Sequence, residues 1–524
     1  MRLIEIPYHQ TNSFSKFILD YISGDKSLAP FYNRFPKLEN FKQQILEKKK
    51  QSLNRQVLVA ALNQQYSGLE TSPFVKKNIQ SLVSENTFTV ATGHQLCLFT
   101  GPLYFIYKII NTLNLAEKLN AEYPEYNFIP IYWMATEDHD FEEVNHVHLF
   151  GKTLTWEQDQ KGGVGAISTY SLETLFRELK PILGDSENAK ELYTLLSEAY
   201  LGNEDLGTAS RYLVNALFSK YGLVILDAET KSLKQEAIPL IKKDVLDQAN
   251  QDLIKETNSK LSKTQAFVRS INFFYLQKGS RERIELVGED YIILNTDLKF
   301  SKSQLEKEIE NHPERFSPNV LLRPLYKEFI LPNLAMIGGG AEVNYWMQLK
   351  STFTENGIVF PMLILRNSVL IVNRHNSEKI EKLGFKISDF FTSEDELNKS
   401  FVARNTESEV DLSSELEQLD SLYDSLLLKT EEKGMQSLML AEKQKQQNVL
   451  KRIEQKLHKV EKQKHSISIN QISQIKRKMF PNGSLQERHD NLISYYLHYG
   501  SSFIENLKVN LRPIDHDFSI LIEE

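Results

Sequence analysis

The stretch that decides the fold begins at Thr87 and reads TFTVATGHQLCLFTGPLYFIYKIINTLNLAEKLN as far as Asn120. Residues 87–92 are rich in β-branched and aromatic side chains, which predicts a strand. Residues 103–119 have helical periodicity, and Pro102 suits the first turn of that helix. A second strand is expected over 128–135, and it ends in the polar run TEDHD at 136–140.

This alternation of strand and helix is typical of an α/β protein with a parallel sheet. Both strands end in a polar cluster that a hydrophobic core does not need. Ligands of open α/β sheets bind just outside the carboxyl ends of the strands. We therefore expect the active site where these two strands end.

Composition excludes several classes of protein. The net charge of −7 gives no electrostatic argument for a nucleic-acid partner. No apolar run approaches the ~20 residues that a membrane-spanning helix needs, and residues 1–5 lack the apolar region of a signal peptide. The only cysteine, Cys97, cannot form an intrachain disulfide, and we interpret it as a small buried hydrophobe. We expect a cytoplasmic protein that contacts no membrane.

At 524 residues the chain should form more than one domain. Residues 1–374 are expected to form the α/β core, with helices at the N-terminus and inserted segments at about 171–300. Residues 375–505 are helical and charged, and 506–524 are expected to return to the core as a strand.

The helical part carries two heptad patterns. Their residues are Leu412, Leu416, Leu419, Tyr423 and Leu426, and then Leu450, Ile453, Leu457 and Val460. Two antiparallel helices, a helix that pairs with another subunit, or a helical cap on its own domain would each bury such a stripe.

The first candidate site lies in the turn after residues 87–92. Gly93 lets the backbone approach a ligand closely, and His94 can donate to a phosphate oxygen when neutral or offset negative charge when protonated. Gln95 belongs to the same turn. Thr100 and Gly101 are further candidates for binding the substrate or nucleotide.

The second candidate site is the run Glu137-Asp138-His139-Asp140. Adjacent acids repel one another unless an amine, a metal or a basic residue compensates them. A zinc site from His139, Asp140 and His146 matches no familiar ligand spacing, so we expect no metal site.

The third candidate site is Gly338-Gly339-Gly340, between an expected strand and a helix. Such glycines can form an anion-binding nest, although tight packing of the helix on the strand explains them equally well. The next helical turns add polar and aromatic candidates, namely Glu342, Tyr345 and Trp346.

Five segments closely resemble one family, the BshC cysteine ligases of bacillithiol biosynthesis. They are 91–108, 133–143, 322–324, 337–346 and 480–488, so the resemblance spans nearly the whole chain. It implies a Rossmann-like core similar to class I nucleotidyltransferases, with connecting-peptide insertions, and a coiled coil that forms a homodimer. It also implies that L-cysteine is joined to the amine of glucosaminyl-malate, which gives bacillithiol.

On this resemblance we expect ATP as a co-substrate, and whether Mg²⁺ accompanies the ATP is left open. His94 and Gly93 would hold the phosphates, Asp138, His139 and Asp140 would supply the base, and Arg323 would bind the malate carboxylates. Two alternatives remain. The cysteine could arrive already activated, so that no ATP is used, or the chain could be a non-enzymatic nucleotide-binding scaffold.

Overall fold

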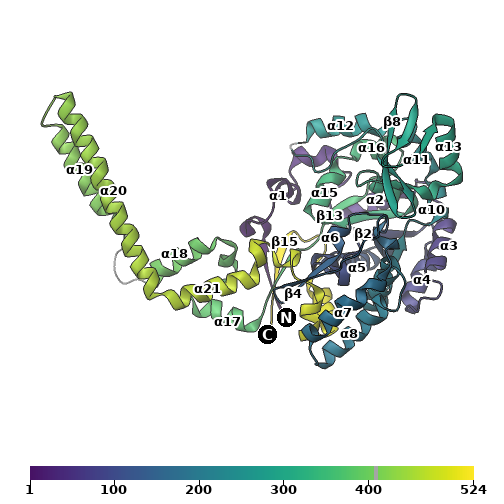
Figure 1. Ribbon diagram of the computed structural model, residues 1–524, viewed down its shortest axis with the longest axis horizontal. Helices are drawn as coiled ribbons and strands as arrows, with labels where there is room; N and C mark the ends of the chain where they lie inside the picture. The colour runs from purple at the N-terminus through teal and green to yellow at the C-terminus, as the bar shows by residue number, and fades with distance from the viewer. Residues whose placement is uncertain (262, 406–410) are drawn as a thin grey trace.

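The computed structural model describes residues 1–261, 263–405 and 411–524, except for the side chains of residues 458, 461 and 462. Its centre is a five-stranded sheet in the order β13-β12-β2-β3-β6, in which every neighbouring pair is parallel. Figure 1 labels β2 and β13 of this sheet. The strands are β2 (Thr87–His94), β3 (Asn127–Met134), β6 (Val224–Asp227), β12 (Asn333–Gly338) and β13 (Met362–Leu365). The predicted α/β class with a parallel Rossmann-like sheet is confirmed.

The strand order creates a crevice at one edge of the sheet. In chain order the strands are arranged 3-2-1-4-5, which is the Rossmann arrangement, and the order reverses between β2 and β12. The first crossover is α5 (Tyr104–Glu122), which begins beside Pro102 as the sequence predicts. The carboxyl ends of β2 and β12 are therefore the expected place for a ligand.

Both faces of the sheet are covered, as a parallel sheet requires. On one face, Phe88 and Val90 of β2 pack with α5 and with α2 (Phe41–Lys48). The other face belongs to the main core, which also takes in helices α3 (Arg55–Gln65), α4 (Pro73–Ser81), α7 (Leu172–Leu183), α8 (Glu187–Tyr200) and α9 (Leu206–Phe218).

The insertions lie between β3 and β12. A hairpin of β4 (His146–Leu149) and β5 (Lys152–Thr155) follows the short helix α6 (Phe141–Val144). After β6 come the helices α10 (Lys231–Glu236), α11 (Ile238–Val245) and α12 (Asn250–Lys260). A second, antiparallel sheet then forms in the order β10-β9-β8-β7-β11. It consists of β7 (Phe273–Gln277), β8 (Ser280–Val287), β9 (Asp290–Ile293), β10 (Lys299–Ser301) and β11 (Phe316–Pro318), with α13 (Lys302–Asn311) before β11.

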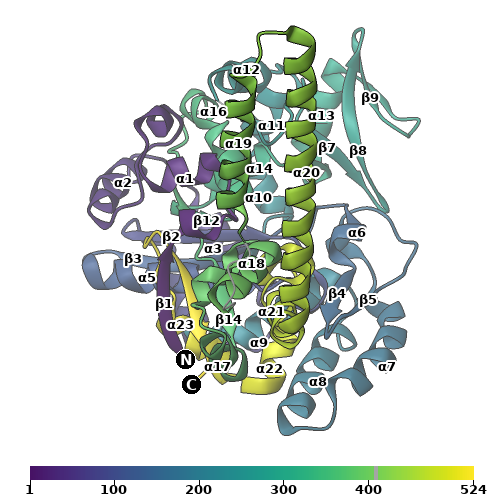
Figure 2. The same ribbon diagram turned by 90° about the vertical axis from the view of Figure 1, so that its left-hand side faces the viewer.

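The two ends of the chain meet in a small third sheet. β15 (Asp517–Ile522) pairs antiparallel with β1 (Arg2–Pro7) and parallel with β14 (Val369–Val372). Figure 2 shows the two termini side by side. The helices of this C-terminal part are α17 (Arg374–Lys382), α18 (Glu394–Asn405), α21 (Ser466–Met479), α22 (Leu492–Tyr499) and α23 (Ser502–Asn510).

A two-helix arm projects from this part, well away from the sheet domain (Figure 1). It consists of α19 (Ser413–Leu427) and α20 (Lys433–Lys464), which run antiparallel. The heptad residues Leu412 to Leu426 are all half-buried, because they face α20. In the second pattern only Leu450 is half-buried, and Ile453, Leu457 and Val460 are exposed. The predicted coiled coil is confirmed, but one chain covers only part of its apolar surface.

Candidate functional site

A cavity of about 480 Å³ opens at the crevice between β2 and β12. Its walls come from the turn after β2, the turn after β3, the start of α15 (Gly340–Met347), and α14 (Leu322–Ile330). It contains ten of the predicted site residues, which are Gly93, His94, Gln95, Asp138, Arg323, Gly339, Gly340, Glu342, Tyr345 and Trp346. The structure thus brings the His94 turn, the acidic run and the glycine turn to one cavity.

His94 is a buried, neutral imidazole. Its ring stacks on Phe105 with the centroids 5.0 Å apart and forms a T-shaped contact with Tyr104, with the centroids 5.3 Å apart. Burial, together with the positive charges of Lys108 and Arg366, holds the pKa of His94 well below its usual value. Of the two roles considered for His94, the structure favours hydrogen bonding by a neutral ring over charge neutralisation.

Asp138 is the member of the acidic run that lines the cavity. Its Oδ2 lies 3.6 Å from Nη2 of Arg323, and its Oδ1 accepts a 2.9 Å hydrogen bond from the His139 backbone N–H. Burial alone would raise the pKa of Asp138, but Arg323 and Arg281 hold it below its ordinary value. Asp138 is therefore a carboxylate, paired with another predicted site residue.

The other three members of the run point elsewhere. Glu137 is buried behind the cavity wall, where its Oε1 lies 2.5 Å from Nζ of Lys234. Nδ1 of His139 lies 2.9 Å from Nη1 of Arg281, which can only donate, so this nitrogen accepts. Asp140 is the N-cap of α6 and accepts from the Glu143 N–H at 3.4 Å. The four residues of the run therefore do not form one cluster, because an ion pair, a hydrogen bond to Arg281 and a helix N-cap give Glu137, His139 and Asp140 partners other than Asp138.

The three glycines do not form a nest of the αR–αL type, since none has a positive φ. Instead they carry the chain from β12 into α15, and Gly339 is the N-cap of that helix. The Gly339 N–H donates to Oε2 of Glu342 at 2.8 Å, and the same oxygen lies 2.6 Å from Nζ of Lys108. A Cβ on Gly338 would lie 2.9 Å from that of Glu342, so close packing requires this glycine.

Thr100 and Gly101 lie outside the cavity. The Thr100 side chain is buried beside Tyr200. Gly101 has φ +66°, and a Cβ there would come within 2.4 Å of Cys97 Cβ. The backbone of this turn, rather than ligand binding, requires glycine at this position.

Several cavity residues were missed by the sequence reasoning. They are Tyr104, Lys108, Glu143, Lys327, Arg366 and Arg488. Lys108 sits in the apolar run Ile106–Ile110, and Arg366 follows Leu363–Leu365 directly. A single charged residue inside an apolar run could have identified both as candidate site residues, since a buried charge needs a partner or a function.

The C-terminal part of the chain helps to build the cavity. Nη2 of Arg366 lies 2.7 Å from Oε1 of the fully buried Glu487, whose Oε2 accepts from the Val369 N–H at 2.9 Å. The neighbouring Arg488 is exposed at the cavity wall. Among the described residues its guanidinium has no ion-pair partner, so it is free to bind an anion.

Basic side chains outnumber acidic ones around the cavity. The basic ones are Lys108, Arg323, Lys327, Arg366 and Arg488, and the acidic ones are Asp138, Glu143 and Glu342. Such a cavity suits an anionic ligand, such as a phosphate or a carboxylate. Within the described parts of the chain, no group of three or more His, Cys, Asp or Glu side chains could hold a metal ion. Nor does any described helix have the length and apolar character to cross a membrane.

Comparisons with known proteins agree with this architecture. The family model described as the N-terminal Rossmann-like domain of bacillithiol biosynthesis BshC matches residues 1–367, and the model of the BshC C-terminal coiled-coil domain matches 369–523. Curated relatives carry the name "Putative cysteine ligase BshC". The protein of Flavobacterium psychrophilum is 43% identical, with 98% of each chain covered. That of Flavobacterium johnsoniae is 41% identical over 98% of this chain and 99% of the relative. That of Christiangramia forsetii is 43% identical, again with 98% of each chain covered.

Proposed function

This chain belongs to the BshC family of bacillithiol biosynthesis, and on that premise we propose that it joins L-cysteine to the amine of glucosaminyl-malate. The product is bacillithiol, and ATP activates the cysteine carboxylate. The observation that carries the proposal is the basic cavity at the reversal point of a Rossmann sheet. The cytoplasm is the proposed location.

Each part of the cavity has a place in this reaction. His94 and the Gly93 backbone hold phosphate oxygens at the end of β2, helped by the positive charge of Lys108. Arg323, aligned by Asp138, binds a carboxylate of the substrate. ATP would supply the leaving group that makes the cysteine carbonyl reactive. Because the cavity is basic, it stabilises the anions that gather during ligation.

The test uses purified full-length protein with L-cysteine and glucosaminyl-malate, with and without ATP. Bacillithiol is measured by mass spectrometry after the thiol is labelled. We expect product only with ATP, and product at an equal rate without ATP would support a pre-activated cysteine donor instead. Absence of product under every condition would contradict the ligase assignment.

Two histidine variants locate the reaction. His94→Ala is expected to abolish product formation while the protein stays folded. His498→Ala is the matched control, because His498 is an exposed histidine that pairs with Glu523 away from the cavity. Full activity of His94→Ala would remove His94 from the mechanism.

A homodimer formed through the arm is part of the same proposal. Leu438, Val449, Ile453, Leu457 and Val460 lie on one face of α20 and are each more than two-fifths exposed, and a second arm would cover such a stripe. Light scattering coupled to size exclusion should give a dimer, and Ile453→Glu together with Leu457→Glu should give a monomer. A dimer that survives both substitutions would place its interface elsewhere.

A further inference from the structure

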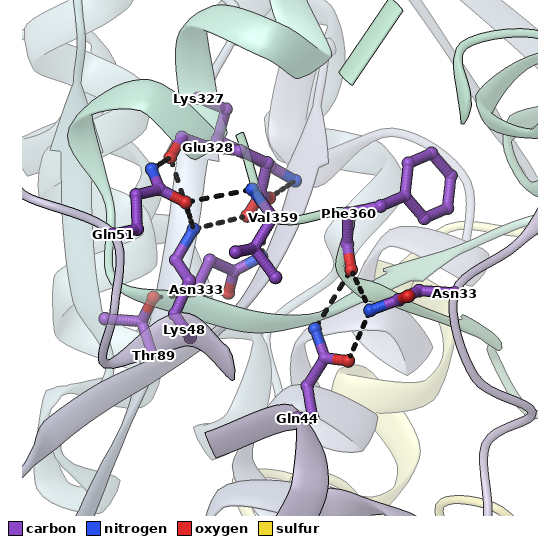
Figure 3. A network of polar contacts seen from close by, with 10 residues as sticks. All are labelled: Asn33, Gln44, Lys48, Gln51, Thr89, Lys327, Glu328, Asn333, Val359 and Phe360. Carbon is purple, nitrogen blue, oxygen red and sulfur yellow. Dashed lines mark hydrogen bonds and ion pairs between the residues drawn. The ribbon is translucent and has the colours of Figure 1, made fainter. Parts of the chain in front are cut away.

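The floor of the cavity rests on a buried cluster of two lysines and one glutamate. Glu328, on α14, is fully buried, and Nζ of Lys48 from α2 lies 3.5 Å from its Oε2. Nζ of Lys327 lies 3.8 Å from its Oε1. Figure 3 shows the two lysines on either side of this single carboxylate.

The polar contacts of this cluster fix Glu328 and Lys48 firmly. Asn333 donates to Oε1 of Glu328 at 2.7 Å, and Thr89 donates to Asn333 at 3.2 Å. Nζ of Lys48 donates to Oε1 of Gln51 at 3.1 Å and to the Glu328 carbonyl oxygen at 3.3 Å. Figure 3 shows how these bonds tie α2 and α14 to the sheet.

Lys327 is held differently. Its side chain is only 7% exposed but lines the cavity, and within the described residues its Nζ donates no hydrogen bond. Within the described parts of the chain, Nζ forms an ion pair with Glu328 and lies over the face of Trp346, whose centroid is 4.5 Å away. An amine without a hydrogen-bond partner, on a side chain that lines a cavity, is available to a ligand bound there.

Charge balance decides which lysine can lose its proton. Two ammonium groups and one carboxylate leave an excess positive charge in a dry core, which is costly. Lys48 has two hydrogen-bond acceptors and keeps its proton more easily than Lys327, which has none. Burial and the charges of Lys108 and Lys48, only partly opposed by Glu328 and Glu342, lower the pKa of Lys327 to about 8.

We propose that Lys327 accepts the proton that the substrate ammonium group must lose before the amide forms, and that Glu328 and Lys48 are positioning residues for it. The role rests on the proposed ligase reaction, because that reaction needs a neutral amine as nucleophile. Glu342, paired with Lys108 on the cavity wall, provides a negative charge that attracts the ammonium group.

The proposed step balances as a proton transfer followed by acyl transfer. One N–H bond of the ammonium group breaks, its electron pair stays on nitrogen, and the proton binds the lone pair of Lys327 Nζ. The amine then attacks the activated cysteine carbonyl, so that the C–N bond forms and the bond to the leaving group breaks. The second amine proton and the proton on Lys327 pass to solvent.

The first experiment needs no turnover. Full-length protein is acylated with trace acetic anhydride from pH 6 to 11, and the reactivity of Lys327 is followed by peptide mass spectrometry, with the exposed Lys190 as internal reference. We expect Lys327 to titrate near 8, and titration near its ordinary value of 10.5 would overturn the proposal.

The second experiment separates a base from a fixed positive charge. Lys327→Met and Lys327→Arg should each lower kcat/KM for glucosaminyl-malate by about 100-fold or more, because arginine keeps the charge but cannot accept a proton. Thermal unfolding of each variant checks the fold. Activity of Lys327→Arg close to that of the wild type would overturn the proposal, since a cation would then suffice.

Two variants outside the cavity test the positioning residues. Glu328→Gln removes the charge that supports protonation, so the acidic limb of the kcat/KM profile should move to lower pH. Lys48→Met removes an opposing cation, so that limb should move to higher pH. Unchanged limbs in both variants would contradict the proposal. Wild-type protein without ligase activity would overturn the proposed function, and with it this role, whatever value the labelling gives.

Discussion

Two lysine clusters of similar chemistry lie in different parts of the molecule. In the core, Lys327 shares the carboxylate of Glu328 with Lys48, and all three side chains are buried. On the arm, Lys443 of α20 pairs with two carboxylates of α19, with Asp424 at 2.9 Å and Asp420 at 3.1 Å.

The two clusters shift the pKa of lysine in opposite directions. Burial lowers the pKa of Lys327 to about 8, whereas hydrogen bonds to Asp424 and Asp420 raise the pKa of Lys443. The core cluster has one carboxylate for two buried lysines, whereas the arm cluster has two exposed carboxylates for one half-buried lysine. The comparison indicates that the ratio of charges and the access of solvent, rather than the presence of an ion pair, decide whether the pKa of a lysine falls or rises.

The largest expected effect comes from removing the shared acid of the core. Glu328→Ala leaves two buried lysines without a counter-charge, which should lower the free energy of unfolding by about 3–5 kcal/mol. Urea denaturation followed by circular dichroism measures it. Asp424→Ala on the arm is the matched control, and its urea midpoint should stay close to that of the wild type. An equal loss of unfolding free energy in the two variants would show that burial does not make the core ion pairs more important for stability than those of the arm.

The next effect is a dependence of stability on pH. The pKa of Lys327 is about 8 in the folded protein and about 10.5 in the unfolded chain, so between these values the unfolded state binds more protons. The free energy of unfolding should therefore rise with pH over this window, by about 3 kcal/mol for this group.

The measurement compares urea denaturation of wild-type protein and Lys327→Met from pH 7 to 10.5. The difference between the two isolates Lys327 from the other titrating groups. The wild type should gain stability relative to the variant as pH rises. A difference that does not change with pH would mean that the pKa of Lys327 is the same in both states.

Much of the fold could be predicted from the sequence because its strands are short, apolar and rich in β-branched residues. The runs that became β2, β3 and β12 were located this way, and so was the helix that follows Pro102. Strand order could not be predicted, because it depends on contacts between segments far apart in the chain. The pairing of β12 with β2 brings together residues 333–337 and 89–92.

The site was predicted only where chemistry and backbone geometry coincide. His94 is the last residue of β2 and Asp138 lies in the turn after β3, and the sheet places both in the cavity. Asp140 was interpreted as catalytic although an acid three residues before Glu143 also fits a helix N-cap, which is the role the structure gives it. Lys327 was missed because a lysine beside a glutamate on an amphipathic helix usually lies in solvent.

The smallest expected effect lies on the arm. There the contribution of the lysine to stability should fall as pH rises, whereas that of Lys327 should grow. Lys443→Met removes the cation that pairs with Asp420 and Asp424. Solvent and salt screen these two ion pairs, so the unfolding transition should hardly move at physiological salt. At low salt the variant should be slightly less stable than the wild type below the raised pKa of Lys443, and the two should converge as pH rises past it. Thermal scans of both proteins at two salt concentrations would measure this difference. The stability of the wild type relative to the variant could instead increase with pH, as expected for Lys327. The arm and core clusters would then shift the pKa of lysine in the same direction, which would contradict the comparison.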